Sequence, residues 1–243
     1  MWCNAGVSDP SGLADALRAA LAAEANPERA AGQQRYMKSA LPFHGVPVPR
    51  VRAIVRTMAA AHPLPDRASW LAAVRAIWDD ATHREQRYGA IGLLRHRRYR
   101  AWLTPDEESV ELLRHLVTSG AWWDLVDELA AHVAGEFLRA DPPTMVPVLR
   151  GWAGEPDLWL RRTAILSQLG ARDATDTDLL VRAIEGSIDD PGFFARKAIG
   201  WALREYSKTD AAWVRGYVAA NAGRLSALSR REALTWLSAR PAG

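Results

Sequence analysis

The feature that most constrains the fold of this chain is a helical pattern that recurs along the sequence, with its two clearest copies offset by 34 residues. Residues 159–165 (WLRRTAI) align with residues 193–199 (FFARKAI), and residues 86–91 (QRYGAI) form a weaker third copy. In each copy a bulky residue, an arginine and a small–apolar pair fall on consecutive helical turns. Repeats at this spacing are typical of stacked helix pairs, because no single pair can bury its apolar face without its neighbours.

The rest of the chain is also expected to be helical. An Ala/Leu-rich stretch over 13–23 follows Ser11, which is a favourable N-cap, and Pro27 opens a second helix. A proline-rich loop over 41–47 precedes a third helix near Pro49, whose missing N–H costs nothing in a first turn. Further helices are expected at about 67–79, 82–98, 105–119, 122–139, 142–153, 157–170, 174–187, 191–207, 209–221 and 228–238.

These patterns predict an all-α fold. No stretch alternates apolar and polar residues over more than four positions, so no strand is expected. The expected architecture is a curved superhelical solenoid of antiparallel helix pairs with a long concave binding face. An ordinary irregular helical bundle is the alternative. No convincing linker divides the sequence, so residues 1–243 are expected to form a single domain.

Composition excludes several classes of protein. A chain that is 49% hydrophobic and 24% charged can bury a core and is not disordered. Cys3 is the sole cysteine and the six histidines show no metal-ligand spacing, so we expect no disulfide and no metal site. No apolar run approaches the roughly 20 residues of a membrane span, and no signal peptide opens the chain. A monomeric protein of the bacterial cytosol or nucleoid, without membrane contact, is expected.

The charge balance weakly favours an anionic partner. The formal net charge is +3, the sequence isoelectric point is about 9.3, and all but three of the 31 basic residues are arginine. A planar guanidinium suits phosphate. GC-rich coding produces the same arginine bias, so this composition alone does not decide the partner.

The segment with the richest chemistry is residues 121–128 (AWWDLVDE). On a helix Trp123 and Asp127 are four residues apart and share a face, while Trp122 shares an adjacent face with Val126. One tryptophan can therefore pack inward while the other stands beside a carboxylate. The structural alternative makes Trp123 a core residue and Asp127 a solvated or capping group.

Two further positions extend this candidate surface. Arg162 follows Trp123 by the same interval at which Trp201 follows Arg162, so stacked repeats can bring all of them to corresponding helices. Aromatic faces attract a cation. A carboxylate stabilises developing positive charge or orients water. An arginine either takes a phosphate or holds the carboxylate ionised.

Five stretches of the sequence, in order, closely resemble the AlkD-type DNA alkylation repair family, the HEAT-like-repeat DNA glycosylases. The resemblance covers nearly the whole chain. The stretches are 35–38 (RYMK) with 42–46 (PFHGV), 122–127 (WWDLVD), 159–166 (WLRRTAIL), 197–206 (KAIGWALREY) and 228–233 (LSRREA).

The resemblance implies hydrolytic excision of cationic alkylated purines, of the N3-methyladenine and N7-methylguanine types, from duplex DNA in base excision repair. It also implies that the damaged nucleotide stays stacked and is not flipped into a pocket, in contrast to most glycosylases. The family's functional residues map onto Trp123, Asp127, Arg162, Trp201 and Tyr36. Asp127, Trp123 and Trp201 would act on the sugar of the lesion, and Arg162 would hold the neighbouring phosphate.

Basic residues around these motifs are expected to contact DNA phosphates, although any one of them can instead be a solvated surface charge. The predicted DNA-binding residues are Tyr36, Lys38, Arg50, Arg162, Lys197, Arg204, Arg230 and Arg231. No cofactor is implied. The alternative function is a non-catalytic HEAT-like-repeat protein that binds bent or branched DNA, which would have no need of the Trp–Asp–Arg–Trp set. A helical scaffold for proteins is the third possibility, and the arginine-rich motif helices argue against it.

Overall fold

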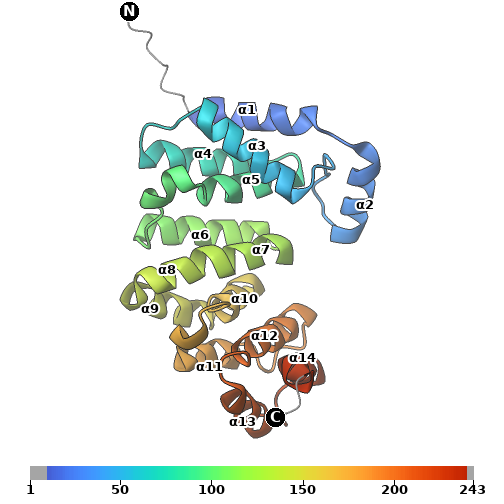
Figure 1. Cartoon of the computed structure of the whole chain (residues 1–243), viewed down its shortest axis with the longest axis vertical. Coiled ribbons are helices and arrows are strands. Elements are labelled where there is room, and N and C mark those ends of the chain that lie inside the picture. Colours follow the sequence, from blue (N-terminus) through green and yellow to red (C-terminus); the bar gives the residue numbers. More distant parts are fainter. Residues whose placement is uncertain (1–9, 240–243) are drawn as a thin grey trace, which may run out of the picture. The chain divides into compact units, whose positions relative to one another are not determined.

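The computed structural model describes residues 10–239, and Cys3 lies outside these described residues. Every regular element in the described range is a helix (Figure 1). The helices are α1 (Pro10–Ala23), α2 (Pro27–Met37), α3 (Val48–Ala61), α4 (Arg67–Asp79), α5 (Arg84–Leu94), η1 (Arg97–Trp102), α6 (Glu107–Gly120), α7 (Trp123–Leu129), η2 (Ala130–Ala134), α8 (Gly135–Ala140), α9 (Pro142–Trp152), α10 (Leu158–Leu166), η3 (Arg172–Ala174), α11 (Thr177–Glu185), α12 (Phe193–Tyr206), α13 (Ala211–Ala220) and α14 (Ala227–Ser238). The predicted all-α class is confirmed, and each of these helices is too short or too polar to cross a lipid bilayer.

The chain forms two compact units, Met1–Leu103 and Thr104–Gly243. In the first unit α1 packs against α3, α4 and α5. Trp70 and Trp78 are completely buried in its core. The Trp70 indole N–H also donates a hydrogen bond of 3.2 Å to the carbonyl of Leu93, so the polar group of this buried side chain has a partner. A single domain over the whole chain stays a prediction.

In the second unit, α10 packs against α7 on one side and α12 on the other, and α12 packs against α14. The contact between α12 and α14 depends on Gly200. A Cβ atom at this position would lie 2.5 Å from the Cβ of Glu232 and 3.1 Å from the carbonyl of Ser229. The missing side chain therefore lets the two helices approach closely, and this approach brings Glu232 to the basic residues of α12.

Two helices differ from the sequence expectation. The helix expected over 82–98 ends at Leu94, and the chain continues as the 3-10 helix η1, whose Tyr99 is buried and stacks on Trp102 with ring centroids 5.1 Å apart. The helix expected over 122–139 is continuous but contains the π-turn η2, which begins shortly after Asp127 and packs against α10. Such turns insert one residue into a helix and occur often near functional sites.

A buried carboxylate organises the proline-rich loop of the first unit. Glu85 is fully buried and accepts hydrogen bonds from the backbone N–H groups of His44 (2.9 Å), Gly45 (2.8 Å) and Val46 (3.0 Å). Gly45 has φ 88°, and a Cβ there would collide with the carbonyl of Asn26 at 2.2 Å. The loop that follows Lys38 is thus held by one side chain of α5.

Glu85→Gln is expected to lower the free energy of unfolding by about 1–3 kcal/mol, because the amide NH₂ replaces an acceptor and faces the half-buried N–H of His44. Chemical denaturation at neutral pH measures this change. Glu28→Gln, an exposed carboxylate in the first turn of α2, is the control and is expected to change stability by under about 1 kcal/mol. Equal stability of Glu85→Gln and the wild type would contradict this account of the loop.

Candidate functional site

The candidate site lies where α7, α10 and α12 begin. Ala121, in the left-handed region at φ 38°, reverses the chain between α6 and α7. Asp157 caps α10 by accepting hydrogen bonds from the N–H groups of Trp159 and Leu160. Asp190 accepts from the N–H of Gly192 at 2.7 Å immediately before α12. Each helix start is therefore fixed locally.

Arg161 ties the start of α10 to the start of α12. Its guanidinium donates to the carbonyls of Glu155 (2.8 Å) and Pro156 (2.7 Å) and to the carboxylate of Asp190 (2.6 Å). These contacts join the loop before α10 to the loop before α12. Arg161 therefore has a structural role, and the adjacent Arg162 is the arginine that contributes to the candidate site.

The centre of the site is a bidentate ion pair between Asp127 and Arg162. The Arg162 Nε and Nη2 atoms donate to the two carboxylate oxygens of Asp127 at 2.7 and 2.8 Å. Arg162 Nη1 donates to the carbonyl of Phe194 at 2.6 Å. The side chain of Arg162 is only 3% exposed and that of Asp127 14%. All three guanidinium nitrogens therefore serve acceptors of the protein, which leaves two N–H groups for any other partner.

Opposing effects act on the carboxyl of Asp127. Burial raises its pKa above the ordinary value, the Arg162 guanidinium lowers it, and the nearby charge of Asp124 raises it again. Each carboxylate oxygen accepts one hydrogen bond from Arg162 and keeps a second lone pair. The arrangement is a fixed, largely dry carboxylate that can still accept a hydrogen bond or face a cation.

An aromatic cluster packs beside this ion pair. Ring centroids of Trp122 and Trp159 are 6.2 Å apart, and the ring of Phe194 lies 5.4 Å from Trp122 and 5.2 Å from Trp159. The Arg162 guanidinium carbon lies 5.9 Å from the Phe194 ring. The neighbouring Phe193 is 59% exposed. The cluster holds the three helix starts together and presents one aromatic ring to solvent.

Trp123 and Trp201 are both half-buried. Trp123 lies one turn before Asp127 on α7, so the two side chains share a face of that helix. Trp201 lies two turns after Phe194 on α12, and residues at that separation on a helix point in nearly the same direction. Trp201 therefore projects from the side of α12 that carries the aromatic cluster.

Three of the four basic residues of α12 and α14 that were predicted to contact DNA have partners within the protein. Lys197 Nζ and Arg204 Nη1 each lie 2.6 Å from a carboxylate oxygen of Glu232, and the hydrogen bond from Lys197 holds the pKa of Glu232 below its usual value. Arg230 donates to the carbonyl of Ala222. Arg231 is exposed on α14.

The other three predicted contacts belong to the first unit. Tyr36 is 76% exposed in the last turn of α2. Lys38 caps the C-terminus of that helix in the left-handed region at φ 49°. Arg50 Nε donates to the carboxylate of Glu24 at 2.6 Å. Contact of these residues with DNA stays a prediction.

The family model described as DNA alkylation repair enzyme matches residues 17–237. The chain belongs to this family. A solved structure described as "Predicted DNA alkylation repair enzyme from Enterococcus faecalis" is similar to it, with 32% identity and a TM-score of 0.77 over 89% of this chain and 98% of that one. None of the curated proteins matches the chain. The expected family is confirmed.

Sequence reasoning selected Asp127 and Arg162 as candidate site residues but missed three residues that position them. Trp122 and Trp159 pack against the ring of Phe194, whose carbonyl anchors Arg162. The sequence contains a sign of this aromatic contact, because Trp159 and Phe193–Phe194 stand at the start of the two aligned repeats. Among residues 10–239, no three His, Cys, Asp or Glu side chains gather as a metal site requires.

Proposed function

We propose that the protein is a monofunctional DNA glycosylase that hydrolyses the N-glycosidic bond of cationic alkylated purines in duplex DNA, without flipping the base and without a metal or cofactor. The observation that carries the proposal is the buried, bidentate Asp127–Arg162 pair beside Trp123. Membership of a DNA alkylation repair family supports it.

The substrate class follows from the chemistry of the leaving group. Alkylation at N3 or N7 gives the purine a positive charge, so the base departs as a neutral molecule when the C1′–N bond breaks and its electrons move to the ring. Such a leaving group needs little help from a general acid. Positive charge grows instead on the deoxyribose, and this charge is what the protein must stabilise.

Asp127 is the group suited to that task. Its carboxylate faces the developing oxocarbenium charge, and a free lone pair orients the attacking water, whose oxygen bonds to C1′ while its proton leaves to the carboxylate or solvent. A preorganised charge in a dry site contributes about 2.7–4 kcal/mol, by analogy with a single oxyanion-hole donor. Asp127 is 14% exposed at its side chain, so little water competes with the sugar.

For Arg162 we favour positioning of Asp127 over direct phosphate contact. Three of its N–H groups already donate to Asp127 and to the carbonyl of Phe194. A bidentate guanidinium keeps the carboxylate ionised and fixes the direction of its oxygens. Trp123 and Trp201 would pack on the sugar–phosphate, each contributing about 0.5–2 kcal/mol through attraction of a cation to an aromatic face.

The test compares a cationic with a neutral alkylated base. Duplexes containing N7-methylguanine or the uncharged O6-methylguanine are incubated with excess protein in EDTA, and the released base is measured by chromatography. Release of N7-methylguanine alone is expected. Release of both bases would mean that the protein selects its substrate by binding the base in a pocket and not by the charge of the leaving group. Release of neither, with tight binding of branched DNA, would favour the non-catalytic alternative.

The excision rate is expected to fall as the pH is lowered through the pKa of Asp127, because the protonated carboxyl carries no charge. Burial raises this pKa above 3.8 and the charge of Asp124 raises it further. Asp124→Asn removes one raising influence, so the acid limb should move to lower pH. Single-turnover rates against pH, corrected for spontaneous depurination, measure the limb. A shift to higher pH would contradict this assignment.

A further inference from the structure

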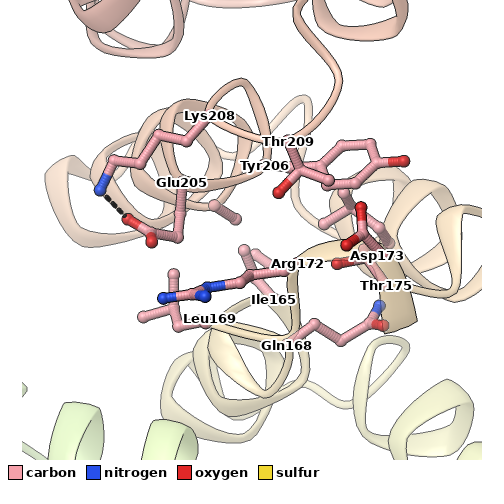
Figure 2. Close-up of a pocket in the computed structure, with 13 residues that line it drawn as sticks. Ile165, Gln168, Leu169, Arg172, Asp173, Thr175, Glu205, Tyr206, Lys208 and Thr209 are labelled. Atoms are coloured by element: carbon pink, nitrogen blue, oxygen red, sulfur yellow. Dashed lines mark hydrogen bonds and ion pairs between the residues drawn. The ribbon is translucent and has the colours of Figure 1, made fainter.

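A hollow of about 560 Å³ lies within the second unit, between the segment that follows α10 and the C-terminal end of α12 (Figure 2). One side is formed by Arg172, Asp173 and Thr175, and the other by Glu205, Lys208 and Thr209. Its walls are mainly polar. The Asp127–Arg162 pair does not account for the charged groups at its rim, and of these groups only Glu205 belongs to a family motif.

Arg172 is the unusual residue of this hollow. It has φ 54°, in the left-handed region that strongly favours glycine and seldom accommodates a long side chain. The side chain is exposed, and its guanidinium forms no hydrogen bond or ion pair with the residues that the structure describes. A glycine would suit the backbone better, so packing and hydrogen bonding do not account for an arginine here.

The charges of the hollow leave the Arg172 end positive. Figure 2 shows the Arg172 side chain extending toward Glu205, whose carboxylate already pairs with Lys208. The Lys208 ammonium also lies 5.5 Å from the Trp236 ring. The carboxylate of Asp173 lies at the other end, beside Tyr206. One guanidinium charge near Glu205 and Lys208 therefore remains uncompensated.

This end of the hollow continues the face of α12 that carries Trp201. Trp201 and Glu205 are four residues apart, so they project from one side of the helix, and Lys208, just beyond its end, pairs with Glu205. The basic residues nearer to Trp201 are engaged, since Lys197 and Arg204 both pair with Glu232. A phosphate that bound them would compete with that carboxylate, whereas the Arg172 side chain has no partner to give up among residues 10–239.

We propose that Arg172, at the rim of this hollow, binds a backbone phosphate of duplex DNA, which rests on the proposed function in that DNA is the substrate. The guanidinium presents donors in a fork that matches two phosphate oxygens. The hydroxyls of Thr175 and Thr209 line the same hollow toward its Asp173 end. The left-handed backbone at Arg172 sets the direction of the side chain.

The variant that isolates this role is Arg172→Gly, because glycine suits φ 54° and deletes a side chain whose guanidinium has no hydrogen-bond partner among the described residues. We expect an unchanged or higher melting temperature, about fivefold weaker binding of a lesion-bearing duplex, and a slope of log K against log salt that is smaller by about 0.9. The charge-matched control is Arg182→Ala, which removes an exposed arginine of α11 outside the hollow. Its slope should stay within error of the wild type.

The other outcomes each have a definite meaning. A lower melting temperature for Arg172→Gly, or a slope equal to that of Arg182→Ala, would overturn the proposal. Saturable shifts of the Arg172 guanidinium NMR signals on adding inorganic phosphate without DNA, with an unchanged DNA slope, would assign the hollow to free phosphate and overturn it too. Failure of the proposed function can be told apart from failure of this proposal. DNA binding and its dependence on salt are measured whether or not the wild type releases base.

Discussion

Asp127→Asn is expected to slow single-turnover release of N7-methylguanine by about a hundredfold to a thousandfold while duplex binding stays close to that of the wild type. The loss corresponds to about 2.7–4 kcal/mol of transition-state stabilisation, the scale of one preorganised charge or donor. The amide retains an oxygen that can accept from Arg162 but has no charge to oppose that on the sugar. Binding should persist because Asp127 itself contributes no positive charge to phosphates.

Asp124→Asn is the matched control for that variant. It removes a carboxylate from the same helix, one turn away, and at neutral pH its rate should remain near that of the wild type. The melting temperature of each variant separates lost chemistry from lost folding. If Asp127→Asn kept a near wild-type rate, the carboxylate would have no part in bond cleavage.

Arg162→Met is expected to lower the free energy of unfolding by about 3–5 kcal/mol at neutral pH. The arginine is 3% exposed and is the ionic partner of Asp127, so its removal leaves a carboxylate that is 14% exposed without its counter-charge. It also leaves the carbonyl of Phe194 without its donor. Denaturant unfolding, followed by tryptophan fluorescence and by circular dichroism, measures the change.

The pH dependence of this deficit carries a definite sign. Arg162 lowers the pKa of Asp127, so the variant raises that pKa further above its unfolded value. A carboxyl with a raised folded-state pKa is most favourable when protonated, and the deficit should shrink as the pH falls. The double variant Asp127→Leu/Arg162→Met should be less destabilised than Arg162→Met alone, since no unpaired charge remains. A deficit under about 1 kcal/mol would mean that the pair is not buried in solution.

Much of the fold follows from local sequence signals. Asp157 and Asp210 cap helices that begin where the apolar periodicity begins, and Pro142 opens α9 as a first-turn proline should. The π-turn η2 could not be predicted, because its sequence (AAHVA) suits an ordinary α-helix and only packing against α10 selects the wider turn.

The residues of the candidate site could be predicted from the sequence, but the hydrogen bonds and ion pairs between them could not. Helical spacing placed Trp123 and Asp127 on one face, yet it left Arg162 with two roles, and only the fold shows its fork on Asp127. Lys197 and Arg204 appear in the sequence as free charges because Glu232, their partner, lies far along the chain on another helix. Ion pairs between helices depend on how the helices pack, and the periodicity of one helix contains no information about that packing.

The most direct test of the central claim is simultaneous measurement of free base and abasic site from an N7-methylguanine duplex, with wild-type protein in EDTA and Asp127→Asn beside it. The account predicts equal amounts of base and abasic site with the wild type, an intact strand before alkaline treatment, and almost no release by the variant. A wild type that binds the duplex and releases no base would contradict it, as would release that Asp127→Asn leaves undiminished.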